Sequence, residues 1–323
     1  MSVKDIRLLT AEPPLHFAAI AALISSQETE PSTQQTLTEW YTRQREDGII
    51  FTAAVDVDGQ VVGFNGIYRD NLNLVQHYGV YLIVDPGLRG KGLGSRLYKD
   101  LLHHAAELNA KTLKVRVRDN CDEGIHFAIQ HGFVEKKHSI EMKFDLKCWD
   151  ESRYATILQT LQKEGFLFTN MAEQGDTQAA RGKLFALNCS VAATDPGSDG
   201  VPPWASFEEF ERDVCSSYWY HPDSQIVAID TNTGAWVAMS AITVFQGADH
   251  AYNLFTGTDV RYRGRKLAQA VKSLALRKAR EFGVDTVRTS HNSENTAMIA
   301  IDTRLGYIRT PGTLVMEKDL DNV

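Results

Sequence analysis

The sequence predicts an α/β protein of the α+β kind, built as two tandem copies of one domain. The chain has 323 residues, more than one compact core usually holds. Runs typical of strands alternate with runs typical of helices, and the second half repeats the first at a constant spacing. We expect a first domain over residues 1–147, a connecting helix over 148–165 and a second domain over 166–323.

A constant offset relates the two halves of the chain. Arg263 follows Arg89 by the same interval by which Gly306 follows Gly132, and we call this interval the repeat offset. No gap is needed from about residue 51 to residue 134 of the first half. A short match can arise by chance, but a fixed offset across a whole unit indicates a duplication. We call the two repeats the first copy and the second copy.

The first copy has a regular order of predicted elements. Its strands are expected over residues 6–11, 73–85, 112–119 and 138–146, with a hairpin over 49–70. Its helices are expected over residues 13–26, 36–47, 94–110 and 123–133. Asp58 and Gly59 supply the tight turn of the hairpin. The second copy repeats this order from residue 166, with its hairpin over 224–242.

Composition narrows the classes of function. A net charge of −7 argues against a general nucleic-acid binder, which usually carries a basic surplus. Four cysteines lie far apart with no CxxC pair, so we expect reduced thiols and no metal site: Cys121, Cys148, Cys189 and Cys215. No apolar run approaches the ~20 residues of a membrane helix, and we see no signal peptide. We therefore expect a cytoplasmic protein without membrane partners, and a monomer whose copies form an internal pseudo-dimer.

The stretch VDPGLRGKGLG, Val84 to Gly94, joins a predicted strand to a predicted helix and carries the clearest chemical signal. Backbone N–H groups at the start of a helix have no internal partner and carry the positive end of the helix dipole. The glycines in the stretch let a ligand approach that backbone, and Arg89 and Lys91 add positive charge. The joint is therefore predicted to hold a phosphate group.

Two known phosphate loops fit this joint poorly. A nucleoside-triphosphate loop requires GxxxxGK followed by Ser or Thr, and nothing in the chain matches. The dinucleotide fingerprint GxGxxG is also missed, because Gly90, Gly92 and Gly94 follow the spacing GxGxG. Asp119 at the end of the next strand can imitate the ribose-binding acid of that fold. A dinucleotide-dependent oxidoreductase therefore stays open as an alternative.

The pattern V-x-P-x-x-R-G-x-G-x-G after a strand resembles the GCN5-related N-acetyltransferases, the GNAT superfamily. Their signature Q/R-x-x-G-x-G/A is met by Arg89, Gly92 and Gly94. The helix, strand and short helix ending in Gly-Phe that follow are also similar to that family. The resemblance covers both copies, so the chain looks like a tandem protein similar to mycothiol synthase. It implies two mixed, mostly antiparallel twisted sheets flanked by helices, each splayed at its fourth strand.

The resemblance also implies two sites for acetyl-CoA. In the first copy its residues would be Leu82, Ile83 and Val84 for the pantetheine arm, and Arg89, Gly90, Lys91, Gly92, Leu93, Gly94 and Ser95 for the pyrophosphate. In the second copy they would be Thr256, Gly257 and Thr258 for the arm, Arg263, Gly264, Arg265, Lys266, Leu267 and Ala268 for the pyrophosphate, and Asn295. Lys266 replaces the signature glycine, so the first loop is expected to bind the cofactor better.

The catalytic residues are harder to predict from the resemblance. The family's usual acid is a tyrosine four residues before the Gly-aromatic pair, and Ala128 and Asp302 stand there. Asp302 can donate a proton only if burial raises its pKa, and we expect it to be a solvated carboxylate instead. His77 and His250, before the two fourth strands, are candidate bases, with a surface histidine as the alternative for each.

The resemblance implies an N-acetyltransferase that moves an acetyl group from acetyl-CoA to the amine of a small molecule. In similar tandem proteins the C-terminal half is catalytic, and this sequence is compatible with that division. Because both copies lack the tyrosine, a CoA-binding sensor or scaffold with one or both domains inactive is an alternative. Acetylation of a protein or peptide N-terminus, or of an antibiotic amine, is a further alternative within the same class.

Overall fold

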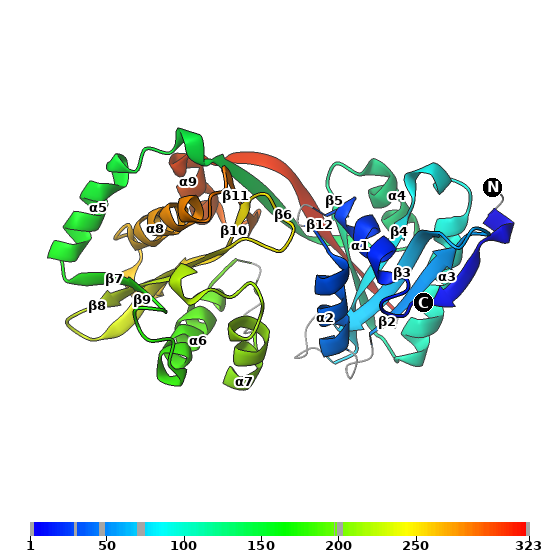
Figure 1. The fold of residues 1–323 in the computed structure, drawn as a ribbon, viewed down its shortest axis with the longest axis horizontal. Helices are drawn as coiled ribbons and strands as arrows, with labels where there is room; N and C mark the ends of the chain where they lie inside the picture. The colour runs from blue at the N-terminus through cyan, green and yellow to red at the C-terminus, as the bar shows by residue number, and fades with distance from the viewer. Residues whose placement is uncertain are drawn as a thin grey trace. The chain divides into compact units, whose positions relative to one another are not determined.

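The computed structural model describes residues 3–28, 31–44, 49–69, 75–196, 198 and 203–320. The end of the helix predicted over 36–47 and the start of the strand predicted over 73–85 fall outside these residues. The chain forms two compact units (Figure 1). Unit 1 contains the residues up to His138 and those from Pro311 onward, and unit 2 contains Ser139–Thr310. Each unit has a mixed sheet with flanking helices, which confirms the predicted fold class.

Unit 1 is built on a six-stranded sheet in the order β1-β2-β3-β4-β5-β12. The strands are β1 (Arg7–Thr10), β2 (Ile50–Val55), β3 (Val61–Arg69), β4 (His77–Val84), β5 (Thr112–Arg118) and β12 (Ile308–Asp319). The helices are α1 (Phe17–Ser25), α2 (Gln34–Gln44), α3 (Leu93–Glu107) and α4 (Asp122–Gln130). Neighbouring strands are antiparallel except β4 and β5, which are parallel.

Unit 2 repeats this plan with the order β6-β11-β10-β9-β8-β7. The strands are β6 (Val134–Asp145), β7 (Phe166–Asn170), β8 (Gln225–Asp230), β9 (Ala235–Thr243), β10 (Ala251–Thr258) and β11 (Thr286–Asn292). The helices are α5 (Ser152–Lys163), α6 (Gln178–Ala192), α7 (Phe207–Phe210), α8 (Leu267–Glu281) and α9 (Thr296–Leu305). Only β10 and β11 are parallel. The bounds of β4, α3, β5 and β6 recur at the repeat offset in β10, α8, β11 and β12.

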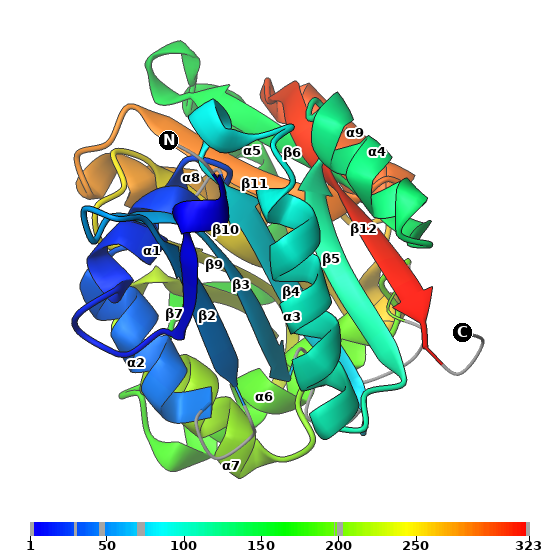
Figure 2. The ribbon, with the colours of Figure 1, turned by 90° about the vertical axis from the view of Figure 1, so that its right-hand side faces the viewer.

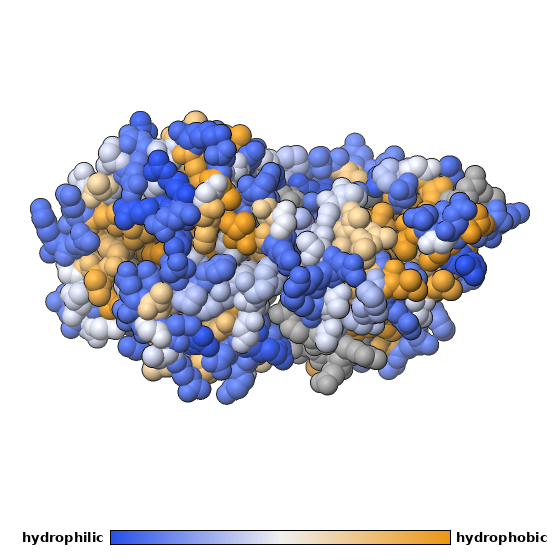
Figure 3. All heavy atoms as spheres, in the orientation of Figure 1, coloured by the Kyte–Doolittle hydropathy of each residue, from blue (hydrophilic) through white to orange (hydrophobic). Residues whose placement is uncertain are grey.

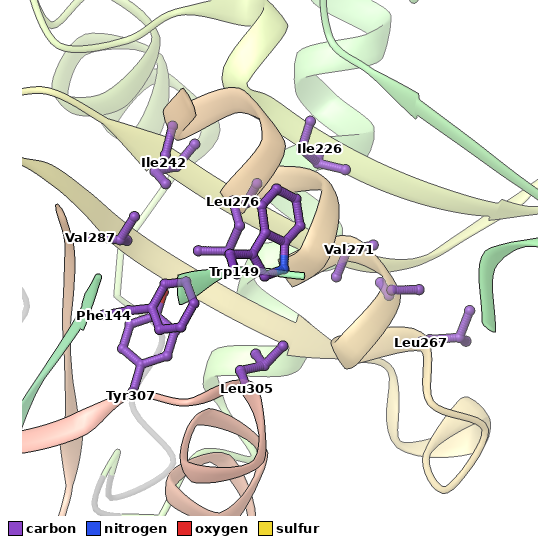
Figure 4. Packing of buried hydrophobic residues seen from close by; sticks show 14 of the residues in the cluster. Phe144, Trp149, Ile226, Ile242, Leu267, Val271, Leu276, Val287, Leu305 and Tyr307 are labelled. Atoms are coloured by element: carbon purple, nitrogen blue, oxygen red, sulfur yellow. The ribbon is translucent and has the colours of Figure 1, made fainter. Parts of the chain in front are cut away.

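Helices cover both faces of each sheet because neighbouring residues of a strand point to opposite sides. In unit 1, Phe51 and Ala53 of β2 pack with Phe17 of α1. Ala54 of the same strand packs on the other side with Leu97 of α3, the helix that lies beside β4 in Figure 2. In unit 2 the largest cluster lies between the sheet and α5, α8 and α9 (Figure 4). α6 and α7 cover the opposite face.

The last strand of each copy completes the sheet of the other unit. β12 pairs with β5 over Thr313–Asp319, and β6 pairs with β11 over Ser139–Asp145. Met316 of β12 accordingly packs with Leu113 in unit 1, whereas Met142 of β6 packs in unit 2. The boundaries of the two units therefore differ from the domain boundaries expected at residues 147 and 166. The reason is that the two copies exchange their final strands.

None of the helices in the described part of the chain has the length and apolar character needed to cross a membrane. The face drawn in Figure 3 carries mostly hydrophilic residues, with hydrophobic residues exposed between them in small groups. Scattered exposed apolar side chains of this kind are ordinary for a folded domain.

Two equivalent methionines test the strand exchange. Met142 and Met316 are 1% and 2% exposed and occupy the same position of the two copies. Replacing either with alanine should cost about 2–5 kcal/mol, because each substitution leaves a cavity in a packed core. Met316→Ala should speed hydrogen exchange in β5 of unit 1, and Met142→Ala should speed it in β11 of unit 2. The reverse pattern, measured by mass spectrometry, would show that each copy keeps its own last strand.

Candidate active site

In each unit the fourth and fifth strands part before the fourth strand ends. β4 pairs with β5 only from His77 to Val80, and β10 pairs with β11 only at Ala251 and Tyr252. These gaps confirm the predicted splay. In unit 2 the unpaired stretch is longer because the pairing stops two residues earlier, and the β9 pairing has an irregularity between Asn253 and Phe255.

A pocket of about 800 Å³ opens in the splay of unit 2. It is lined by the parted end of β10, the end of β11, the start of α8, one side of α9 and the segment after α6. Among its lining residues are Thr256–Thr258, Arg263, Lys266–Ala268 and Asn295, all predicted from the resemblance. A volume of this size lies within the range of small-ligand and cofactor sites.

The start of α8 presents uncapped backbone N–H groups to this pocket. Lys266 is the N-cap residue, with φ of 67° and no side-chain hydrogen bond to cap the helix. Gly92 has the same position and a similar left-handed conformation, with φ of 89°, at the start of α3. Glycine adopts this conformation without strain, whereas lysine does so at a cost. Both helix starts therefore have the backbone geometry that suits an anion, and in unit 2 this geometry faces the pocket.

The arginine of the signature has a structural bond in both copies. Nε of Arg89 donates to the carbonyl of Val84 at 3.2 Å, and Nε of Arg263 donates to the carbonyl of Thr258 at 3.4 Å. Each bond ties the loop to the end of the fourth strand. Lys91 also donates to a backbone carbonyl, that of Gly87, at 2.8 Å. These charged side chains therefore stabilise the conformation of the loop, and they can also attract an anionic ligand.

An aromatic side chain stands beside the helix start in the first copy. The ring of Phe127 on α4 would come within 3.4 Å of a Cβ at Gly94 in the first turn of α3. The ring also stacks on His131, with ring centroids 4.2 Å apart. Ile301 is the equivalent of Phe127 at the repeat offset and lines the pocket of unit 2. The smaller side chain leaves more room beside the helix start in the second copy.

Asp302 lies in a buried charged cluster, so the expectation of a solvated carboxylate is wrong. Its side chain is 0% exposed and forms an ion pair with the ammonium of Lys272, which is also 0% exposed. Its Oδ2 lies 2.7 Å from Nε2 of His291. Burial alone would raise the pKa of Asp302, but the attraction of Lys272 and the hydrogen bond with His291 outweigh it and lower that pKa. Asp302 is therefore ionised and does not serve as the proton donor considered from the sequence.

His291 joins this cluster to the pocket. It comes from β11, lines the pocket and has 9% of its side chain exposed. Asp195 lines the same pocket from the segment after α6, and its Oδ1 accepts a hydrogen bond from Asn295 at 2.5 Å. Burial raises the pKa of Asp195, with His291 and Asn295 opposing the shift. The pocket thus contains an imidazole and a carboxyl group suited to proton transfer.

The histidines predicted as bases lie at the other end of their strands. His77 begins β4, and His250 precedes β10, whereas the splay opens toward Val84 and Thr258. Seven or eight strand residues correspond to about 25 Å. His250 is 5% exposed, and its Nδ1 lies 2.9 Å from Oδ1 of Asp249, so it is not a surface histidine.

Asp119, the candidate ribose-binding acid, is engaged within unit 1. Its Oδ2 accepts a hydrogen bond from the N–H of Gly312 at 2.8 Å and lies 3.0 Å from Nε2 of His138. The carboxylate therefore holds β12 and the end of β5 together. Those contacts give the dinucleotide alternative no support.

Aligning the two copies position by position reveals the residues of the buried cluster from the sequence alone. At the repeat offset, ionisable or charged side chains of the second copy, those of His291, Lys272 and Asp302, stand where the first copy has Val117, Tyr98 and Ala128. No local motif contains the three positions, because each belongs to a different element: α8, β11 and α9.

Comparison with known proteins agrees with this architecture. Residues 17–133 match the model of the acetyltransferase (GNAT) family. The whole chain superposes on a GCN5-related N-acetyltransferase from Sphaerobacter thermophilus with a TM-score of 0.72, covering 99% of this chain and 97% of that one at 18% identity. Residues 17–133, which lie in the first copy, are therefore similar to that family, and the superposition shows that the whole chain has the fold of the compared structure.

Two further relatives show how far the likeness extends. A tandem GNAT protein from the clavulanic acid biosynthesis pathway has a TM-score of 0.72 and 15% identity, covering 97% of this chain and 98% of its own. This likeness shows the tandem GNAT fold and nothing of the substrate. YwnH of Bacillus subtilis (strain 168), provisionally named a phosphinothricin acetyltransferase, is 28% identical over 139 residues, which are 42% of this chain and 83% of that protein.

The buried ion pair gives a prediction about stability. Asp302→Leu should lower the free energy of unfolding by about 3–5 kcal/mol, because it leaves the ammonium of Lys272 buried without its partner. The double variant Lys272→Met/Asp302→Leu should recover most of that loss, since it leaves no charge of the pair in the core. Urea denaturation measures both changes. Equal losses in the single and double variants would contradict a charged pair at this place.

Proposed function

We propose that the second copy is the catalytic one and moves an acetyl group from acetyl-CoA to the amine of a small molecule. The observation that carries this proposal is the pocket in unit 2, which connects the uncapped start of α8 with the imidazole of His291. One cavity thus offers an anion-binding helix start and a group suited to proton transfer. In the first copy, Val117 and Ala128 stand where His291 and Asp302 stand in the second.

The residues of this pocket fit the donor substrate. The diphosphate would lie against the backbone N–H groups of Lys266 to Ala268, where the helix dipole favours negative charge. The side chains of Lys266 and Arg304 line the same pocket and add positive charge. The pantetheine arm would take the place of a strand beside Thr256–Thr258, since β11 has left that side of β10. Acetyl-CoA would supply the activated thioester carbonyl.

The other lining residues support an amine as acceptor. Ser139, Ser290 and Asn292 supply polar groups close to His291, and Asp195 supplies a carboxyl group. A carboxylate in the wall of a pocket favours a cationic ligand such as a protonated amine. The acceptor would be a small molecule, because the donor occupies much of a pocket of about 800 Å³.

The proposal reverses the order in which the sequence ranked the two loops. The first loop keeps all three glycines, but Phe127 stands beside the start of α3. We propose that the first copy does not catalyse the transfer. Binding of CoA there without turnover is the alternative role of that copy, and the presence of Val117 and Ala128 in place of His291 and Asp302 favours it.

A charge placed in the first turn of α8 tests the donor site. Ala268→Glu should weaken the binding of acetyl-CoA about tenfold or more, measured by calorimetry, because the carboxylate competes with the diphosphate for the same N–H groups. An acidic residue in the first turn of a helix favours the helix, so the variant should stay folded. Ala268→Gln has the same bulk without the charge and should weaken binding much less.

The equivalent substitution in the first copy is Gly94→Glu. Comparing its loss of affinity with that of Ala268→Glu shows which of the two loops binds acetyl-CoA more tightly. A larger loss of affinity in Gly94→Glu than in Ala268→Glu would place the donor in the first copy and contradict the proposal. Release of free thiol from acetyl-CoA with a panel of amines tests turnover itself. Binding of acetyl-CoA without thiol release from any amine would favour the sensor alternative.

A further inference from the structure

We propose that His291 is the general base of the acetyl transfer and that Asp302 and Lys272 are its positioning residues. The inference rests on the proposed function of the second copy and adds the residue that moves the proton. It follows from the contacts of the buried cluster and from the comparison of the two copies.

The cluster is present in one copy and absent from the other. Both copies have the same elements in the same order, and the bounds of α8 and β11 equal those of α3 and β5 shifted by the repeat offset. A network needed for the fold alone would be expected in both. The first copy instead fills these positions with Tyr98, Val117 and Ala128, which together bring no charge. Because a buried ion pair is often no more stable than apolar residues of similar size, stability gives no reason to keep it.

The contacts define which nitrogen of His291 can react. The Oδ2 of Asp302 lies 2.7 Å from Nε2, and the Oδ1 of Asp302 faces the ammonium of Lys272. An ionised carboxylate can only accept a hydrogen bond, so Nε2 carries the proton of the neutral ring. Nδ1 then has a free lone pair. Among the described residues Asp302 is the one that bonds the imidazole, so Nδ1 is left for a ligand in the pocket.

The other members of the cluster do not reach the pocket. Asp302 and Lys272 are 0% exposed, and Tyr307, whose ring lies 4.9 Å from the ammonium of Lys272, is 3% exposed. None of the three lines the pocket, whereas His291 does. His291 is therefore the member of the cluster that can touch a substrate. Asp302 fixes its tautomer, and Lys272 keeps Asp302 ionised.

The proton balance of the reaction gives His291 a defined task. An amine enters as its ammonium form, which has no lone pair and cannot attack. Nδ1 takes one proton, the freed lone pair forms the bond from nitrogen to the acetyl carbon, and the electron pair of the C–S bond leaves on sulfur. The second nitrogen proton neutralises the thiolate, and the imidazolium releases its proton to water. The products are the amide, the free thiol and one proton.

The test compares acceptors that need a base with one that does not. His291→Gln should lower kcat roughly 10²-fold or more for the primary alkylamine of the panel that the wild type uses best, because that amine is protonated at neutral pH. Hydroxylamine is largely unprotonated at neutral pH, so its rate should fall far less. Calorimetry should show that acetyl-CoA binds to His291→Gln about as tightly as to the wild type.

Two further measurements separate His291 from its neighbours. Nitrogen-15 spectra should show Nε2 of His291 protonated in the wild type and this preference lost in Lys272→Met/Asp302→Leu, with the same acceptor-dependent loss of kcat. Asp195 is the competing candidate for the base. Asp195→Asn should raise the KM of the cationic alkylamine, but it should lower kcat to the same extent for the alkylamine and for hydroxylamine. An acceptor-dependent loss of kcat in Asp195→Asn and none in His291→Gln would overturn the inference and assign the base to Asp195.

The outcomes distinguish this inference from the function on which it rests. Turnover of the alkylamine by His291→Gln at the wild-type rate would refute the role of His291 and leave the acetyltransferase proposal intact. A wild type that binds acetyl-CoA but releases thiol with no amine would refute the proposed function, and the inference would fall with it. Equal losses with both acceptors would show a structural role for His291 and also overturn the inference.

Discussion

The parting of β10 from β11 after Tyr252 is the constraint on which the rest of the site depends. Two parallel strands that stay paired leave no room between them, and their backbone groups satisfy each other. Once β11 turns away, one edge of β10 is open, and the space beside it becomes the pocket. The start of α8 and the end of β11 reach that space because they follow and flank the parted strand.

The two copies show how one scaffold can carry different chemistry. The shared elements fix the splay and the helix start in both units, and the side chains decide what each splay contains. In the first copy the ring of Phe127 stands beside the helix start and stacks on His131. In the second copy a lysine takes a left-handed conformation that glycine holds in the first, and a charged cluster reaches the pocket. A strained residue and a buried ion pair at one site indicate that function rather than stability shaped it.

Sequence patterns predicted most of the fold and part of the site. The repeat, the order of elements, the splay and the helix starts follow from local periodicity, glycine positions and a family resemblance. The exchange of β6 and β12 could not be predicted in this way. Both strands carry the same pattern, and either β5 or β11 can satisfy their hydrogen bonds. The environment of Asp302 was also hidden, since its partners Lys272 and His291 lie on two other elements, α8 and β11. Burial and ion pairing at that position are tertiary properties.

A crystal structure of the protein grown with acetyl-CoA tests the central claim most directly. The account predicts donor density between β10 and β11, with the diphosphate on the first turn of α8 and the thioester near His291. Density between β4 and β5 alone, with the diphosphate beside Gly92, would contradict it and return the active site to the first copy.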